Sequence, residues 1–213
     1  GTAAWTMIVK GIGGRLFRER GVVDSSLLPK IPSVADPPLV RWVDGFNADF
    51  LQYDVYLDGS GSKHNLWRDA ERGGYSAVTR TVGEDGVVRW VGIYGTVPAG
   101  LDQSSNCAEL YAIYMALAKG VGPLRLHSDH KNHVDCFNAG KEACLAKRGR
   151  PFLDVWRWIW ELVDSIGAEL VSIIWVPGHA KESAGETPLQ AARRVGNDVA
   201  DHWAKEGRKL HDP

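Results

Sequence analysis

The chain has 213 residues, of which 44% are hydrophobic and 24% are charged, a composition typical of an ordinary globular domain. Its 25 basic and 26 acidic side chains leave a formal charge of −1, which excludes a strongly basic overall field but not a local basic groove. Three cysteines without a C-x-x-C pair, no membrane-length apolar run and no secretory signal lead us to expect an intracellular protein (cytoplasm or nucleus) without structural zinc or a membrane partner.

Residues 1–50 differ in pattern from the rest of the chain. The stretch SSLLPKIPSVADPPLVRW concentrates proline, serine and isolated apolar residues without a sustained period, as in a linker or an extended segment. We expect residues 1–50 to form an N-terminal arm or linker packed at the periphery, or the tail of an upstream domain. Residues 51–210 are expected to form one domain.

From residue 53 onward the pattern is regular. Runs rich in β-branched and aromatic residues predict strands at 53–58, 73–82, 86–97, 123–129 and 169–176. Apolar residues at helical spacing, bounded by caps and glycines, predict helices at 104–120, 131–140, 152–167 and 195–207. Three successive strands followed by alternating strands and helices imply an α/β domain whose mixed sheet carries helices on its faces.

Four acidic residues occupy informative positions in this pattern. Asp58 and Asp129 end two strands, Glu109 lies in the first turns of a helix, and Asp201 lies in the last helix. Ligand sites of such sheets gather beyond the strand ends, where these carboxylates would lie close together. Crowded carboxylates repel one another, and either raised pKa values or a bound cation relieves the repulsion. Carboxylate oxygens favour Mg²⁺ or Mn²⁺ over zinc.

Five short motifs now support a family resemblance. LDGSGS, SSNCAELYA, LHSD, WVPGHA and GNDVADHWAK occur in this order between residues 53 and 209. Together they resemble the successive motifs of the ribonuclease H family, type 1. The resemblance implies a ribonuclease H-like fold with a five-stranded mixed sheet, in which three antiparallel strands precede parallel strands, flanked by helices.

The resemblance also implies a reaction. Asp58, Glu109, Asp129 and Asp201 match the family's metal-binding carboxylates, which implies two Mg²⁺ ions, with Mn²⁺ as a substitute. The implied reaction is hydrolysis of the RNA strand of RNA–DNA hybrids, leaving 5′-phosphate and 3′-hydroxyl ends. His179 matches the histidine that assists proton transfer and product departure, although a loop histidine is more commonly just solvated.

Substrate contacts are implied at two places. Ser104, Ser105 and Asn106 match a polar triplet that reaches the minor groove of the hybrid, where the 2′-hydroxyl distinguishes RNA from DNA. Gly59 and Ser60 match positions at which the backbone approaches the RNA strand. Helix capping is the alternative explanation for the triplet, and one side chain can serve both purposes.

Several features depart from the family pattern or carry no clear chemistry. The short segment before Phe152 retains basic residues that would form either a small phosphate-binding patch or a solvated surface: Lys141, Lys147, Arg148 and Arg150. We interpret three tryptophans of the following helix as packing residues: Trp156, Trp158 and Trp160. Three histidines surround Asp129 without other signs of a zinc site: His127, His130 and His133.

The segment between His179 and Asn197 is the largest departure. It is expected to be a long loop, and such loops resemble those of retroelement-borne family members. Arg193 and Arg194 there would contact phosphate or be exposed. The implied partners are an RNA–DNA hybrid and a reverse transcriptase domain in the same retrotransposon polyprotein, with the protein itself expected to be a monomer.

Two competing functions use the same fold. One is a catalytically idle connection-type module that only binds hybrid or a polymerase domain, which would commonly have lost one of the acids. The other is a different nuclease or an integrase that cuts DNA, against which the Ser-Ser-Asn triplet argues. Cleavage of labelled hybrid, duplex DNA and duplex RNA distinguishes the three.

Overall fold

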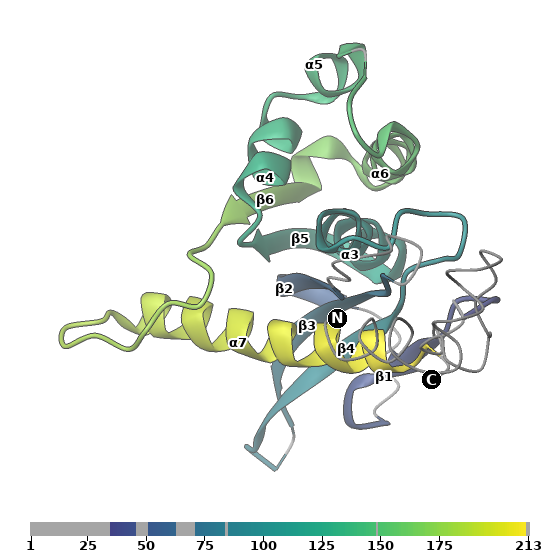
Figure 1. Ribbon diagram of the computed structural model, residues 1–213. Coiled ribbons are helices and arrows are strands. Elements are labelled where there is room, and N and C mark those ends of the chain that lie inside the picture. Colours follow the sequence, from purple (N-terminus) through teal and green to yellow (C-terminus); the bar gives the residue numbers. More distant parts are fainter. Residues whose placement is uncertain (1–34, 46–50, 63–70, 84, 148, 212–213) are drawn as a thin grey trace, which may run out of the picture.

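The computed structural model describes residues 35–45, 51–62, 71–83, 85–147 and 149–211. Within them the chain forms one six-stranded sheet in the spatial order β1-β4-β3-β2-β5-β6 (Figure 1). The strands are β1 (Val40–Trp42), β2 (Leu51–Gly61), β3 (Gly73–Val82), β4 (Val88–Thr96), β5 (Gly120–Ser128) and β6 (Val171–Trp175). Neighbours among β1, β4, β3 and β2 pair antiparallel, and β2 also pairs parallel with β5, which pairs parallel with β6. The predicted mixed α/β sheet is therefore confirmed.

The sheet has one strand more than the five that were predicted. The additional strand, β1, falls inside the segment expected to be an arm, and it pairs antiparallel with the edge of β4. The backbone N–H of Leu39 also donates to the Thr96 hydroxyl at 2.8 Å. A three-residue strand is too short for an alternating pattern to be visible in the sequence, and its pairing depends on a partner far along the chain.

Helices cover both faces of the sheet. The helices are α3 (Ser105–Lys119), α4 (Lys131–Asn138), α5 (Lys141–Ala146), α6 (Leu153–Ile166) and α7 (Pro188–Lys209). Short 3₁₀ turns occupy η2 (Val43–Gly45) and η4 (Ala168–Leu170). In Figure 1, α7 runs along one side of the sheet as a single long helix, and α3 lies on the other side with α6. No helix in these described stretches is both long and apolar enough to cross a membrane.

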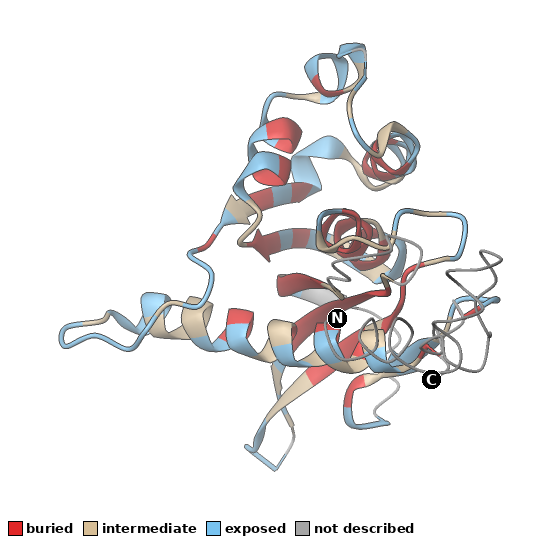
Figure 2. Cartoon of the chain, in the orientation of Figure 1, coloured by how far each residue is buried: buried red, intermediate tan, exposed pale blue. Residues whose placement is uncertain are grey.

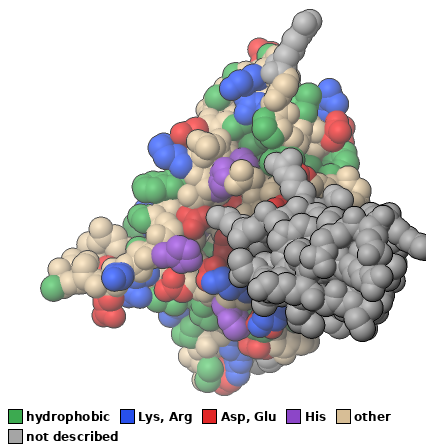
Figure 3. Space-filling model, viewed as in Figure 1, with side chains coloured by type: hydrophobic (Ala, Val, Ile, Leu, Met, Phe, Trp, Pro, Cys, Tyr) green, Lys and Arg blue, Asp and Glu red, His purple; other side chains and the backbone are tan. Residues whose placement is uncertain are grey.

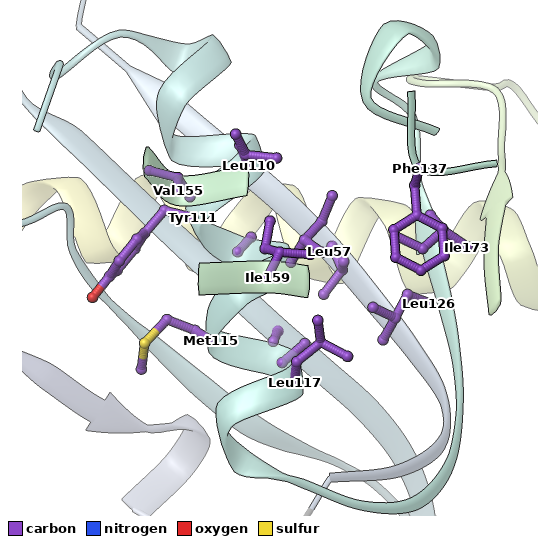
Figure 4. Close-up of a cluster of buried hydrophobic side chains, with 14 of the residues drawn as sticks. Leu57, Leu110, Tyr111, Met115, Leu117, Leu126, Phe137, Val155, Ile159 and Ile173 are labelled. Atoms are coloured by element: carbon purple, nitrogen blue, oxygen red, sulfur yellow. The ribbon is translucent and has the colours of Figure 1, made fainter. Parts of the chain in front are cut away.

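Alternation along β2 divides the core in two. Leu57 points into the main hydrophobic cluster with residues of α3 and α6, where Leu110 and Ile159 are buried (Figure 4). Tyr56 points the other way, into a smaller cluster under α7 that includes Ala200. Figure 2 shows that burial is concentrated in α3 and the central strands, whereas the loop before α7 is exposed. The strand carrying Asp58 is therefore packed on both faces.

The last helix is longer than predicted. We expected a loop over residues 180–195 and a helix from 195, but α7 begins at Pro188. Thr187 caps this helix, because its hydroxyl accepts from Gln190 N–H while the Gln190 side chain accepts from the Thr187 N–H. The Arg194 guanidinium pairs with Glu186 at 2.9 Å and fastens the first turns. A second unpredicted element is the short helix α5.

Candidate active site

Three of the four predicted acids meet at the carboxyl ends of the parallel strands. Asp58 of β2, Glu109 of α3 and Asp129, which follows β5, each offer a carboxylate oxygen, and these oxygens all lie within 4.8 Å of one another. In the parallel register Tyr56 is opposite His127, so the two aspartates follow at equivalent positions. Asp129 directly follows β5 as predicted, whereas Asp58 does not end its strand, because β2 continues to Gly61. Figure 3 shows acidic and histidine side chains gathered on the face viewed there.

Glycines after Asp58 bring α3 against the end of β2. A Cβ atom on Gly59 would lie 2.0 Å from the backbone nitrogen of Glu109, and one on Gly61 would lie 2.3 Å from that of Ser105. The Ser105 hydroxyl also donates to the Gly59 carbonyl at 2.7 Å. Only glycine permits this close approach of strand and helix. The contact places Glu109 beside Asp58, and Gly61 was not among the residues predicted to matter.

The end of β6 and the segment that follows it pack against Asp129. A Cβ on Gly178 would lie 2.4 Å from its Oδ2 atom, so this glycine packs directly on the carboxylate. The Trp175 indole N–H donates to the Asp129 carbonyl at 3.0 Å, and Val176 N–H donates to the Ser128 carbonyl at 3.0 Å. Neither Trp175 nor Gly178 was predicted to belong to the site. The W-V-P-G-H stretch contained the signal, since a glycine soon after a strand often permits close packing.

Burial and crowding raise the pKa values of the two carboxyl groups at the centre, Asp58 and Glu109. Burial raises the pKa of Asp58 to about 6, and the charges of Asp129 and Asp201 add to that effect. Burial raises the pKa of Glu109 well above its usual range, with further contributions from Asp58 and Asp129. Glu109 Oε2 is buried and has no hydrogen-bond partner within the protein. An orphaned buried oxygen among crowded carboxylates fits a hard divalent cation, because the cation would supply the missing positive charge.

Asp201 lies near this group without joining it. Its charge contributes to the raised pKa of Asp58, but its carboxylate accepts from Lys205 Nζ at 2.6 Å one turn further along α7. The side chain of Asp201 is 22% exposed, whereas Asp58 and Glu109 are buried. Its assignment as a metal ligand stays a prediction.

His179 lies on the exposed segment between β6 and α7. Its backbone has a φ of 48°, a left-handed conformation that non-glycine residues seldom adopt. It directly follows Gly178, the glycine packed on the Asp129 carboxylate. Its predicted part in proton transfer stays a prediction.

The residues predicted to contact substrate fall into two kinds. Ser104 caps α3 by accepting from Cys107 N–H at 3.4 Å, and the Ser105 hydroxyl is bound to Gly59, so both serines serve the fold. Ser60 is buried in β2. Asn106 is exposed, and its side-chain oxygen lies 3.2 Å from the Nε2 atom of His130. Asn106 is therefore the exposed residue of the triplet, whereas Ser104 and Ser105 are half-buried.

The predicted basic patch is largely engaged within the protein. Lys141 pairs with Asp164, and an Nη1–H of Arg150 points at Cys136 Sγ at 2.9 Å. Lys147 is exposed, and Arg148 lies outside the described residues. Arg194, which was expected to contact phosphate or solvent, is paired with Glu186.

Most of the tryptophans and histidines singled out in the sequence pack against other side chains. Trp156 and Trp160 of α6 are buried, as expected of packing residues, and Trp158 is 37% exposed. His127 is buried, stacks on Tyr56 and lies 2.7 Å from an Asp54 oxygen. The rings of His130 and His133 stack on each other with centroids 3.7 Å apart, and burial lowers the pKa of His133 to about 3.

Comparison with known proteins agrees with this geometry. The RNase H family model matches residues 51–209, three quarters of the chain. The chain belongs to the RNase H family. No protein of curated function matches the sequence.

Several solved structures share the fold of this RNase H protein. LC9-RNase H1, described as a type 1 RNase H with the type 2 active-site motif, aligns with a TM-score of 0.56 and 17% identity over 78% of this chain and 76% of its own. The solution structure of the PFV RNase H domain aligns with a TM-score of 0.53 and 18% identity over 74% and 94%. Prototype foamy virus protease-reverse transcriptase aligns with a TM-score of 0.55 and 17% identity over 91% of this chain and 25% of its own.

Proposed function

We propose that the protein is an endoribonuclease that hydrolyses the RNA strand of RNA–DNA hybrids with two divalent metal ions, Mg²⁺ or Mn²⁺, leaving 5′-phosphate and 3′-hydroxyl ends. The observation that carries the proposal is the convergence of Asp58, Glu109 and Asp129 within 4.8 Å, where a buried Glu109 oxygen has no partner. Membership of the RNase H family supports it. A foamy viral protease-reverse transcriptase with a similar fold has been solved in complex with an RNA/DNA hybrid, at a TM-score of 0.50 and 15% identity.

Each residue of the site has a proposed part in the reaction. Asp58, Glu109 and Asp129 would hold the metal ions, and Asp201 would join them by exchanging Lys205 for metal. When bound, the ions would activate the attacking water and stabilise the departing 3′ oxygen. His179, exposed beside Gly178, would carry a proton to or from the product.

The hybrid would lie over the end of β2 and the start of α3. The backbone groups of Gly59 and Ser60 would approach the RNA strand there. Ser104, Ser105 and Asn106 at the amino end of α3 would reach the minor groove. Because this recognition uses the ribose and the groove shape, little base-sequence preference is expected. We also propose that the protein works inside the cell as a monomeric domain, in the same retrotransposon polyprotein as a reverse transcriptase.

The decisive experiment incubates the protein with an end-labelled RNA–DNA hybrid in Mg²⁺, in Mn²⁺ and in EDTA. Cleavage of the RNA strand is expected in either metal and not in EDTA, with fragments whose 5′ ends carry phosphate. Parallel reactions with duplex DNA and duplex RNA of the same sequence test specificity. No cleavage of hybrid in either metal, with binding retained, would instead establish the idle binding module. Cleavage of duplex DNA would establish a different nuclease.

A further inference from the structure

His130 bridges the amino ends of two helices beside the acidic group. It is the N-cap residue of α4, where its Nδ1 atom accepts from the backbone N–H of His133 at 3.3 Å. Its other ring nitrogen, Nε2, lies 3.2 Å from Oδ1 of Asn106 in the first turn of α3. One imidazole therefore contacts both a helix cap and the exposed polar side chain at the site.

The cap favours one tautomer of this imidazole. The backbone N–H of His133 lies 3.0 Å from the carbonyl oxygen of His130 and 3.3 Å from its Nδ1 atom. Because an N–H can only donate, Nδ1 faces it as the second acceptor, which favours a ring without a proton on Nδ1. In the neutral ring the proton then resides on Nε2, which donates to the Asn106 side chain. The atom that accepts must be the amide oxygen, so the NH₂ group of Asn106 is turned away from His130. The orientation of an amide, usually ambiguous, is thus determined by a neighbouring helix cap.

The ring of His130 is itself held in place from the core. It stacks on the buried ring of His133, with centroids 3.7 Å apart and planes inclined by 19°. His133 in turn meets the buried Trp156 of α6 edge to face, with centroids 6.0 Å apart. The backbone N–H of His130 also donates to the Ser128 hydroxyl at 3.2 Å. Asn106 is therefore linked through two rings to the main hydrophobic core.

We propose that His130 is a positioning residue, which holds the Asn106 amide so that its NH₂ group donates to an acceptor in the minor groove of the bound hybrid. The acceptor would be a ribose 2′ oxygen or a base acceptor, that is purine N3 or pyrimidine O2. The inference rests on the proposed function of the same site. Without the ring, the amide rotates freely and presents its oxygen or its nitrogen, and ordering one such side chain changes affinity by on the order of 3- to 10-fold.

The test separates positioning from helix capping. Asparagine is among the best N-cap residues, so His130→Asn keeps a cap on α4, but its side chain is too short to reach Asn106. We expect KM for hybrid cleavage to rise by on the order of 3- to 10-fold, with kcat changed less than about twofold, and a similar KM for Asn106→Ala. The double variant should be no worse than Asn106→Ala alone. Independent, multiplying effects in the double variant would overturn the proposal, as would an unchanged KM in His130→Asn.

Modified substrates identify the acceptor. Hybrids with a single 2′-deoxynucleotide at successive RNA positions should include one position at which the wild type loses affinity and Asn106→Ala does not. If no 2′ substitution shows this pattern, hybrids with 3-deazapurines, which lack the N3 acceptor, test the bases in the same way. A wild-type response that Asn106→Ala retains in both series overturns the proposed contact.

A spectroscopic readout keeps this inference distinct from the proposed function. In ¹⁵N-labelled protein, long-range ¹H–¹⁵N correlation of the His130 ring should show Nε2 protonated and Nδ1 unprotonated, and the Asn106 amide resonances should shift in His130→Asn. A proton on Nδ1 overturns the positioning role even if hybrid is cleaved. If the wild type neither binds nor cleaves hybrid, the proposed function fails and the contact with the groove fails with it, whatever tautomer is found.

Discussion

The two sides of the site differ in how they hold their acids. On the sheet side, Asp58 and Glu109 are buried and kept together by a glycine contact between β2 and α3. On the α7 side, Asp201 is partly exposed and already paired with Lys205, and His179 lies on an exposed segment. The first side is tightly packed and electrostatically unfavourable without a cation, whereas the Asp201 carboxylate on the second side already has a charged partner.

This difference suggests that the sheet side provides most of the affinity for a cation, whereas Asp201 can exchange its lysine partner for a cation at little cost. Buried crowded carboxylates lower the stability of the empty site and raise its affinity for a cation, because metal binding removes the repulsion. A carboxylate paired with an exposed lysine loses little free energy when it exchanges the lysine for a cation, since such pairs contribute only about 0–1 kcal/mol. Removing the charge on either side should therefore lower activity, but it should raise the free energy of unfolding only on the sheet side.

The largest effect is expected from Asp58→Asn. Hybrid cleavage should fall by on the order of 10²–10³-fold or more, because the transition state loses electrostatic stabilisation. In EDTA at pH 7 the free energy of unfolding should rise by about 2 kcal/mol, because a buried charge among like charges has been removed. Rates on labelled hybrid and urea unfolding measure the two effects.

Asp201→Asn is the matched variant on the other side. It should also lose activity, but without any gain in stability, because it removes a satisfied carboxylate. If both variants change stability in the same direction, the contrast between the two sides is wrong.

The next largest effect should come from Gly59→Ala. The added Cβ would lie 2.0 Å from the backbone nitrogen of Glu109, and backbone cannot move aside as a flexible side chain can. We expect a loss of about 3 kcal/mol in the free energy of unfolding, together with weaker Mg²⁺ binding as Glu109 is pushed from Asp58. Gly100→Ala is the control, because a Cβ there meets nothing within 4 Å. Similar stabilities of the two variants would show that the strand and helix can separate at little cost.

The sheet side of the site could be predicted from the sequence for a physical reason. Strand alternation and strand ends are local properties, and parallel pairing then aligns Asp58 with Asp129. The glycine contact with α3 could not be found this way, because it joins residues about 50 positions apart through backbone atoms. The G-S-G-S stretch after Asp58 was the sequence signal for this contact, but we interpreted it only as a place where the backbone approaches the substrate.

The α7 side was predicted less well, although part of its signal is local. Thr187, Pro188 and Gln190 form a capping box with proline at the first helical position, a recognisable helix start that was taken for loop. The ion pair of Asp201 with Lys205 follows from i,i+4 spacing once the helix is known.

The hydrogen bond between Asn106 of α3 and His130 at the start of α4 could not be predicted, since the sequence around neither residue indicates it.

The buried pair also predicts how stability depends on pH. The folded pKa of Asp58, about 6, exceeds its value of 3.8 in a free chain, so in EDTA its contribution to stability is complete below pH 4 and is lost as pH rises to about 6. The loss should be roughly 3 kcal/mol, and Glu109 should extend it to higher pH. Urea unfolding of wild type and Asp58→Asn across pH 4–8 isolates the contribution of Asp58 together with its effect on Glu109, because titrating groups that do not interact with Asp58 cancel in the difference. Saturating Mg²⁺ should abolish the loss, and an equal pH profile of the two proteins would contradict the burial of this charge.

The smallest effect is expected from Lys205→Gln on the α7 side. Its ammonium group must leave Asp201 before that carboxylate can bind metal, and an exposed i,i+4 pair contributes about 0.3–0.5 kcal/mol. Removing the lysine should therefore lower the Mg²⁺ concentration for half-maximal cleavage by about twofold, while the free energy of unfolding changes by less than about 0.5 kcal/mol. Lys209→Gln is the matched control, because Lys209 pairs with Glu206 on the same helix and not with Asp201. If both variants shift the Mg²⁺ dependence equally, the effect comes from the overall positive charge of α7. The proposal that Asp201 exchanges Lys205 for metal is then wrong.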